Sequence, residues 1–285
     1  MSTTSVSTSM APYRIAAETF VIPWNLPAPP MGYFPINSML IRGAEPTLID
    51  TGAPANRDAW LEAAWSLVAP EDVRWVFLSH DDRDHSGNLM QVMEACPNAT
   101  LLTSWFAVGR MFEEWEIPLD RVRFVNDGDS VDLGDRELVA LRPPVFDNPT
   151  TRGVFDTHTG AYWSVDTFAT NVPEPLAESA DLPDSAFEDG QLLGGRLIAP
   201  WGELLDDAKY QRYVDRVQQL DITVVAGCHT PVIRGSRVAE AFATTRRLPN
   251  LEAWHDFTQA DLESWMDAAA PASPQVPEQS PPHEI

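Results

Sequence analysis

The segment at residues 80–87, with the sequence HDDRDHSG, is the feature that most constrains what this chain can form. It follows directly on the apolar run 74–78 (RWVFL), which we predict to be a buried strand. Three carboxylates crowded into one loop repel one another unless a cation neutralises them. The sequence therefore favours a metal site at the end of a strand.

The spacing within this loop divides its side chains between two metal ions. Alternate residues of an extended segment point the same way, so we predict that His80 and Asp82 reach one ion. Asp84 and His85 then face a second ion. The alternative is a solvated acidic loop, since aspartates are common in loops, but the two histidines that bracket the aspartates favour the metal site.

The composition argues against several classes of function. The chain has 285 residues, 44% of them hydrophobic, and a formal charge of −23. A charge of this sign repels phosphate backbones and anionic lipids, so we expect no binding to nucleic acid or to a membrane. Cys96 and Cys228 make no disulfide framework, residues 1–11 do not resemble a signal peptide, and no apolar run nears the roughly 20 residues that span a bilayer. We therefore expect a soluble, cytoplasmic protein.

Short apolar runs alternate with amphipathic segments along most of the chain, which predicts a layered α/β fold. We predict strands at 38–42, 47–49, 74–78, 100–103 and 223–226, and helices at 57–68, 88–95, 104–112 and 209–220. Strands 123–125, 130–133 and 137–141 are predicted to form a meander, and 153–155 with 161–165 a hairpin. Residues 171–197, rich in Pro, Gly and acid, are predicted to be a long loop that serves as a lid or an interface.

One folded domain is predicted over residues 12–250, with no linker inside it. Residues 1–11 are rich in Ser and Thr, residues 270–285 are rich in Pro and acid, and both segments are predicted to be disordered. Residues 251–269 are predicted to carry a C-terminal helix, with helical spacing over 251–267. Its apolar content exceeds what one face needs, so it is a candidate subunit interface, with packing on its own domain as the alternative.

Four motifs in the right order resemble the metallo-β-lactamase superfamily over residues 33–235. The loop at 80–87 fits the H-x-[HDE]-x-D-H signature of that superfamily. The other motifs are Asn37-Ser38 followed by LIDTG at 48–52, VDTF at 165–168 and GCHTP at 227–231. The resemblance implies an αββα sandwich, in which two mixed sheets are flanked by helices and two metal ions lie at the strand ends.

Two departures from the zinc hydrolases of the superfamily make this chain resemble its di-iron, flavodiiron-like branch. Asp82 stands where the zinc enzymes typically carry a histidine. Asp147, in the segment 142–149, stands where a further histidine ligand is usual, and a carboxylate there also resembles the di-iron β-hydroxylases of this fold. The resemblance implies one site formed by His80, Asp82, Asp147 and a bridging Asp166, and a second formed by Asp84, His85, Asp166 and His229.

Oxygen-rich ligation of this kind favours iron, with manganese and zinc as alternatives. Asp147 is alternatively a hydrogen-bond acceptor for His80 instead of a ligand. We predict that Asp50 supports the site or forms its turn, and that Cys228 is a buried structural thiol that points away from the metals. The remaining histidines, His158, His255 and His283, are predicted to lie at the surface.

Two metal ions that share a hydroxide lower the pKa of bound water, and on this basis we expect a metal-dependent hydrolase. Its predicted catalytic carboxylates are Asp82, Asp84 and Asp147. The alternative is a di-iron oxidoreductase, or an O2- or NO-binding protein of flavodiiron type, with a separate electron donor. A donor is needed because we expect neither an FMN site nor a flavodoxin domain in this chain. A non-catalytic role is the last alternative.

The expected substrate is a small, apolar or aromatic molecule. An activated ester or an aryl ether suits a hydroxide nucleophile, and the resemblance extends to members of this branch that act on nitroaryl ethers. We expect a homo-oligomer, or a hetero-oligomer with a related subunit. The aromatic residues near the predicted loops are Trp24, Phe34, Trp105, Phe106, Trp163 and Trp201.

Overall fold

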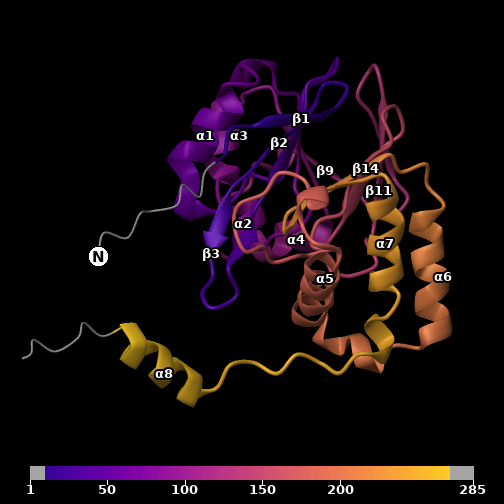
Figure 1. The fold of residues 1–285 in the computed structure, drawn as a ribbon. Coiled ribbons are helices and arrows are strands. Elements are labelled where there is room, and N and C mark those ends of the chain that lie inside the picture. The colour runs from indigo at the N-terminus through magenta and orange to yellow at the C-terminus, as the bar shows by residue number, and fades with distance from the viewer. Residues whose placement is uncertain (1–9, 270–285) are drawn as a thin grey trace, which may run out of the picture. The chain divides into compact units, whose positions relative to one another are not determined.

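The computed structural model describes residues 10–269. The chain divides into one unit that ends at Ala253 and a second, small unit that begins at Trp254. In the first unit two mixed sheets lie between layers of helices, so the predicted α/β sandwich is confirmed (Figure 1). The segments predicted to be disordered, 1–11 and 270–285, lie outside the described residues except for residues 10 and 11.

The first sheet has seven strands and changes from antiparallel to parallel along its width. In spatial order the strands are β1 (Tyr13–Ala16), β2 (Thr19–Ile22), β5 (Ser38–Ile41), β6 (Thr47–Ile49), β7 (Trp75–Phe77), β8 (Thr100–Thr103) and β9 (Val122–Phe124). From β1 to β6 neighbours are antiparallel, and from β6 to β9 they are parallel. The parallel part places several strand ends at one edge, where α/β folds usually bind ligands.

The second sheet has six strands. In order they are β10 (Ser130–Asp132), β11 (Glu137–Leu141), β12 (Gly153–Asp156), β13 (Ala161–Trp163), β14 (Val224–Gly227) and β15 (Thr230–Arg234). Only β13 and β14 pair in parallel. A separate two-stranded hairpin is formed by β3 (Asn25–Pro27) and β4 (Tyr33–Pro35).

Helices cover the outer face of each sheet, and Figure 1 shows α1 and α3 on the opposite side of the strands from α6 and α7. The first sheet is covered by α1 (Arg57–Trp65), α3 (Leu89–Ala95) and α4 (Trp105–Met111), and the second by α5 (Asp184–Ile198), α6 (Asp207–Gln218) and α7 (Ser236–Thr245). The 3₁₀ helices are η1 (Pro54–Asn56), η2 (Pro70–Asp72), η3 (Leu119–Arg121), η4 (Ser179–Asp181), η5 (Pro200–Leu204) and η6 (Leu248–Asn250). No helix among the described residues has both the length and the apolar character needed to cross a bilayer.

Three hydrophobic cores hold the four layers together, and strand alternation explains them. Successive strand residues point to opposite faces. In β6, Leu48 faces the helices on the first sheet and Ile49 faces the second sheet, and in β7 Val76 and Phe77 do the same. Because both faces of these strands are buried, their sequences read as continuous apolar runs, as the RWVFL segment does.

The predicted meander at 123–141 is wrong in its first member. β9 pairs with β8 in the first sheet, whereas β10 and β11 pair with each other in the second. The chain changes sheets at Val125–Ser130, where Gly128 has a φ of +92°. A change of sheet leaves no periodicity signal that distinguishes it from an ordinary turn.

The predicted long loop at 171–197 is also wrong, because α5 occupies its second half. Its glycines suggested a loop, but they serve a close contact. A Cβ on Gly194 would lie 2.3 Å from the backbone oxygen of Ala169, and one on Gly190 would lie 2.7 Å from Thr170. The glycines therefore let α5 pack directly against the segment that follows β13.

The small C-terminal unit contains α8 (Gln259–Ala269). The predicted helix over 251–267 is therefore wrong in its first turns. Thr258 and Asp261 explain the later start, since the Thr258 Oγ accepts from the Asp261 amide and the Asp261 carboxylate accepts from the Thr258 amide. This reciprocal cap fixes where a helix begins. Phe257 packs on Trp265, with ring centroids 4.8 Å apart.

Several elements had no sequence prediction, namely β1 to β4, β15 and α7. The hairpin strands β3 and β4 are only three residues long, and each contains a proline, Pro27 or Pro35. Proline within an apolar run usually argues against a strand, except in an edge strand. Both strands of this separate hairpin are edge strands, so they can contain proline.

Candidate metal centre

Loops at the ends of five strands bring the predicted site residues together. Asp50 follows β6, His80 follows β7, Asp166 follows β13 and His229 follows β14. The single helical turn α2 (Arg83–Ser86) carries Asp84 and His85, and Asp147 lies in the loop after β11. These side chains, which lie between positions 50 and 229 of the sequence, thus meet at the edge where the two sheets end.

Asp166 lies at the centre of this cluster and faces three histidines. Its Oδ2 lies 3.4 Å from Nε2 of His80, and its Oδ1 lies 3.1 Å from Nε2 of His85 and 3.4 Å from Nε2 of His229. The side chain is only 2% exposed. A carboxylate that presents its two oxygens to two sets of imidazoles has the position of a bridge between two ions.

The other carboxylates divide between the two sides of Asp166. Asp84 lies 3.1 Å from His229, and Asp82 lies 3.5 Å from His80. Asp147 lies with His80 and Asp82, with one potential ligand atom of each within 4.8 Å of the others. The structure thus brings together both predicted groups of four. That these side chains bind metal stays a prediction.

Buried polar atoms that lack hydrogen-bond partners indicate whether the site fits a metal ion. Both carboxylate oxygens of Asp166 and Nε2 of His85 are buried and have no hydrogen-bond partner. Buried polar atoms are rarely left unpaired, because the cost is about 1–3 kcal/mol or more for a charged group. Cations in contact with these atoms would remove that cost, so the residues present fit a dinuclear metal centre.

Asp50 orients His85 from behind. Its Oδ2 lies 2.8 Å from Nδ1 of His85, and it also accepts hydrogen bonds from the Ser79 hydroxyl and from Nε1 of Trp163. With Nδ1 engaged, Nε2 of His85 is the nitrogen left to face Asp166. Asp50 therefore supports the site, as predicted from the sequence. Its backbone, with a φ of +60°, also forms the turn that follows β6.

Backbone contacts hold the other ligand loops in place. Nδ1 of His229 lies 2.9 Å from the carbonyl oxygen of Pro35. The buried Asn37 side chain donates to the backbone oxygens of Gly227 and Thr230, on either side of His229. The Asn-Ser motif of the sequence thus ties the first sheet to the turn that carries the last histidine.

Strained backbone flanks Asp166. Val165 has a φ of +58° and Phe168 a φ of +70°. A β-branched residue with positive φ is a genuine outlier, and such strain persists where the surrounding structure over-determines it. Here Val165 accepts a backbone hydrogen bond from Cys228, and its side chain is fully buried. The two strained residues shape the turn that carries Asp166.

The histidines carry raised pKa values in the metal-free chain. Burial lowers the pKa of His85, but Cys228, Asp84, Asp50 and Asp166 outweigh burial and raise it well above 6.5. Burial also lowers the pKa of His229, and Cys228 and Asp84 again raise it well above 6.5. Protons therefore compete with metal ions for these nitrogens.

The carboxylates respond in opposite directions on the two sides of the site. Burial raises the pKa of Asp166, but the three histidines outweigh it and lower that pKa to about 2. Burial also raises the pKa of Asp84, but His85 and His229 outweigh this effect and hold that pKa well below its usual range. By contrast, loss of solvent and repulsion from Asp166 raise the pKa of Asp147 to about 6. Asp147 is the carboxyl best able to hold a proton near neutral pH.

A polar network positions the loop that carries Asp82. The Asn148 side chain donates to Asp82 at 3.1 Å, and the hydroxyl of Thr150 donates to Asp81 at 2.8 Å. Arg110 forms an ion pair with Asp81 at 2.7 Å. The sequence analysis missed this network, although Asp81 and Asn148 adjoin the predicted ligands Asp82 and Asp147.

Cys228 does not point away from the site, so that prediction is wrong. Its Sγ lies within 4.8 Å of potential ligand atoms of Asp84, His85 and His229. The register of β14 and β15 shifts at this turn, which breaks the simple alternation on which the prediction rested. Cys228 is thus a buried sulfur beside the second predicted group of ligands.

The remaining predicted residues have varied positions. Trp163 is fully buried and bound to Asp50, whereas Trp105 is 69% exposed and stacks on Phe106. Trp201 packs on Phe146 with centroids 5.2 Å apart. His158 and His255 are exposed as predicted, Trp24 is half-buried at the edge of the core between the sheets, and His283 lies outside the described residues.

Comparison with known proteins shows what this chain is similar to. Residues 31–150 match the model of the metallo-β-lactamase superfamily. A Nostoc sp. protein described as diflavin flavoprotein A 2 is 32% identical over 147 residues, which are 51% of this chain and 25% of that protein. The coenzyme F420H2 oxidase of Methanothermobacter marburgensis is 27% identical over 195 residues, 65% of this chain and 48% of the oxidase. The chain thus spans between a quarter and a half of these relatives.

The fold has solved counterparts. The flavodiiron protein from Giardia intestinalis superposes with a TM-score of 0.74 at 15% identity, over 84% of this chain and 59% of that chain. The hydrolase expected from the sequence is wrong, because these relatives are named as flavoproteins and as an oxidase, which are oxidoreductases. Residues 31–150 thus match the metallo-β-lactamase superfamily, and the relatives and structural neighbours of the chain include flavodiiron-type proteins.

Proposed function

We propose that this chain is a dinuclear-metal oxidoreductase that reduces O2 with electrons from a separate donor. One observation carries the proposal. Two groups of oxygen and nitrogen side-chain atoms lie on either side of a single buried carboxylate, Asp166, whose two oxygens lie 3.1–3.4 Å from three histidine nitrogens and make no regular hydrogen bond. The relative named as an oxidase supports the choice of O2 as the acceptor.

Iron is the metal that we propose for both positions. The group of His80, Asp82, Asp147 and Asp166 offers three carboxylates and one imidazole. Hard oxygen ligands favour iron or manganese, whereas zinc sites lean towards nitrogen and sulfur. Two Fe(II) ions bound here would each give one electron, which with two protons would reduce O2 to H2O2, and two further electrons from the donor with two protons would complete reduction to water. Zinc has no redox chemistry and would support no such reaction.

The side chains of this site would bind, orient and supply protons. Asp166 joins the two positions, and Asp50 directs Nε2 of His85 towards them. Reduction of O2 consumes protons as well as electrons. Asp147 is exposed at the edge of the cluster, so we propose that protons from solvent enter the site on its side.

The electron donor is a further part of this proposal. The matched relative described as a diflavin flavoprotein is about four times as long as the aligned region, since that region is 25% of it. We propose that a flavoprotein on another chain, or a reduced small-molecule carrier, delivers electrons here. Oligomerisation and location in the cytoplasm stay predictions.

A single-turnover experiment tests the proposal. The full-length protein is loaded anaerobically with Fe(II) and mixed with O2, while an O2 electrode records uptake and absorbance follows oxidation of the iron. We expect O2 uptake that scales with bound iron. Asp166→Ala should lose iron and uptake together, whereas Asp189→Ala, an exposed aspartate on α5, should behave as wild type.

The outcome that would contradict the proposal is specific. A wild-type chain that binds two irons but consumes neither O2 nor NO after reduction would show that the centre is not an oxidoreductase of this kind. Uptake that persists in Asp166→Ala would show that the reaction occurs elsewhere or on free iron.

A further inference from the structure

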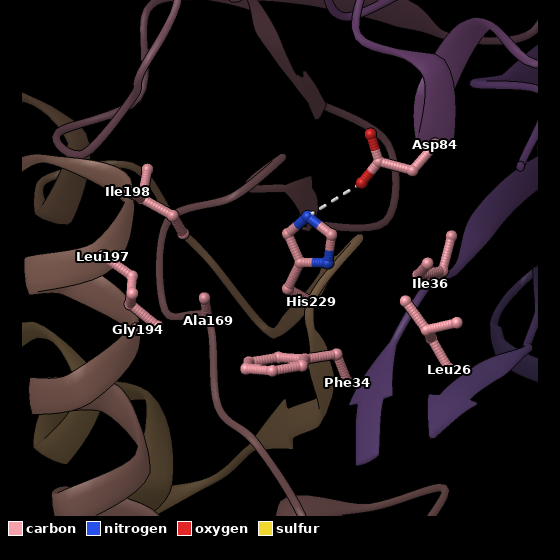
Figure 2. A pocket seen from close by; sticks show the side chains of 9 residues that line it. All are labelled: Leu26, Phe34, Ile36, Asp84, Ala169, Gly194, Leu197, Ile198 and His229. Atoms are coloured by element: carbon pink, nitrogen blue, oxygen red, sulfur yellow. Dashed lines mark ion pairs between the residues drawn. The ribbon is translucent and has the colours of Figure 1, made fainter. Parts of the chain in front are cut away.

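An apolar pocket opens on one side of the metal centre. It has a volume of about 320 Å³ and lies between the β3–β4 hairpin and helix α5. Figure 2 shows Asp84 and His229 at its inner end, with α5 on one side and the hairpin strands on the other. Asp84 is 29% and His229 18% exposed, whereas His80, His85 and Asp166 are at most 2% exposed. The pocket is therefore a route by which a molecule reaches the second group of ligands.

The walls of this pocket are built by close packing. Leu26 and Phe34 are directly paired across the hairpin and line the pocket together. The hairpin is tied to the segment after Asp166, because Tyr33 and Val172 exchange both backbone hydrogen bonds. On the other side, Gly194 lets α5 lie against the backbone of Ala169, which fixes the wall formed by Leu197 and Ile198.

The size of the pocket exceeds what a diatomic substrate needs. One water molecule takes about 30 Å³ in the liquid, and a dry apolar cavity of about 150 Å³ holds benzene. A volume of about 320 Å³ lies at the lower end of the range for small-molecule sites, which are mostly apolar with a few polar groups. One or two rings would fill it.

The walls of the pocket are almost free of charged groups. Among the described residues that line it, the only ionisable ones are Asp84 and His229, and none is Lys or Arg. The other lining residues, such as Ala169, Leu197 and Ile198, are apolar. A neutral molecule with an apolar body avoids the cost of placing charge among Leu26, Phe34 and Ile36.

We propose that this pocket binds a neutral, largely apolar organic molecule of one or two rings, with one end against Asp84 and His229. The inference rests on the proposed function, because it makes that molecule a second ligand or substrate of the same centre. The pocket itself is formed by the protein, so its occupancy can be measured without metal.

Two fluorescent probes with the same ring system test this proposal. 1-Naphthol is neutral at pH 7, and naphthalene-1-sulfonate carries one negative charge on the same two fused rings. Each is titrated into the full-length protein, with and without metal. We expect the neutral probe to bind the metal-free chain at least about tenfold more tightly than the sulfonate, since burial of an unpaired charge is costly.

Matched variants locate the bound probe. Leu197→Trp places a larger, aromatic side chain in the pocket. We expect it to weaken binding of the neutral probe by about tenfold or more, because the pocket loses volume. Leu204→Trp is the same change at a side chain that is 81% exposed and does not line the pocket, and it should leave binding unchanged. Leu26→Trp, at a position 39% exposed, provides a second block if Leu197→Trp does not fold.

The outcomes separate the two proposals. Equal loss of binding in the Leu204→Trp control, or no loss in either pocket variant, would overturn the pocket assignment. Tighter binding of the sulfonate than of the neutral probe would overturn the assigned ligand class. If the probe binds as expected while the iron-loaded chain consumes neither O2 nor NO, the pocket stands and the proposed function falls.

Discussion

Nδ1 of His85 lies 2.8 Å from the carboxylate of Asp50, which is fully buried and also bound by Ser79 and Trp163. This pair joins the turn after β6 to the helical turn α2. Thr51 strengthens the connection, because both its amide and its hydroxyl donate to the backbone oxygen of His85. Asp50 thus sets the direction of a predicted ligand without facing the metals itself.

We predict that Asp50→Asn lowers affinity for the second metal ion by about 10- to 100-fold, the usual cost of losing such a supporting partner. Asparagine tolerates the positive φ at this position, so the backbone is not the cause of the loss. Equilibrium dialysis with metal analysis measures the effect. Asp156→Asn is the control, since Asp156 is equally buried but pairs with Arg136 outside the metal cluster. Similar metal loss in both variants would contradict the role given to Asp50.

Metal binding should release protons. Cys228 and the nearby aspartates raise the pKa of His85 and of His229 well above 6.5 in the metal-free chain, which favours their protonated forms, whereas metal binding needs the unprotonated ring. Calorimetry at pH 7 in buffers of different ionisation enthalpy measures the number released. We expect protons to be released on metal binding, with the number released falling as the pH rises. A heat that does not depend on the buffer would contradict the assignment.

The same shifts predict how stability depends on pH. A histidine with a raised folded-state pKa stabilises the metal-free chain fully below 6.5, and this contribution is lost as the pH rises through the folded-state pKa. The metal-free chain should therefore lose stability as the pH is raised above 6.5. With metal present, stability should instead rise with pH, because loss of protons from the histidines favours metal binding. Urea denaturation with and without metal provides the measurement.

Asp147 and Asp84 should affect different ions. Asp147 lies with His80 and Asp82, and Asp84 lies with His85 and His229. We predict that Asp147→Asn weakens binding of one ion and that Asp84→Asn weakens binding of the other. Each variant should then retain about one metal ion per chain at limiting metal concentration. Metal content that is unchanged in Asp147→Asn would instead support the alternative in which Asp147 only accepts a hydrogen bond.

The glycines of α5 offer a matched test of packing. A Cβ on Gly194 would lie 2.3 Å from the Ala169 oxygen, whereas one on Gly195 would have only Leu248 nearby, at 3.9 Å. Gly194→Ala should destabilise the fold by about 1–3 kcal/mol through overpacking. Gly195→Ala should be neutral or stabilise it by up to about 1 kcal/mol, as expected for a helix interior. Urea unfolding of both variants tests this, and equal effects would contradict the packing.

The candidate site was predictable because its signals are local. The loop at 80–87 places four predicted ligands within six residues, directly after an apolar run that forms β7. Asp50, Asp166 and His229 each follow a short strand in the same way. Ligand type and order along the chain were therefore readable, and strand topology then required the strand ends to meet.

The errors arose where contacts distant in the sequence decide local structure. The glycines of α5 read as a loop because their partner, Ala169, lies in another segment. Cys228 was assigned to the wrong side because a register shift between β14 and β15 breaks the alternation. The hydrolase expectation failed because ligand type alone does not separate hydrolytic from redox chemistry, which the names of the relatives do.

The central claim is that two metal ions share Asp166. Metal analysis of the purified full-length protein, after loading with Fe(II) and removal of free metal, tests it most directly. We predict two irons per chain in the wild type and a loss of both in Asp166→Ala, with Asp189→Ala unchanged. Less than one metal per chain in the wild type, or equal metal content in Asp166→Ala, would contradict the claim.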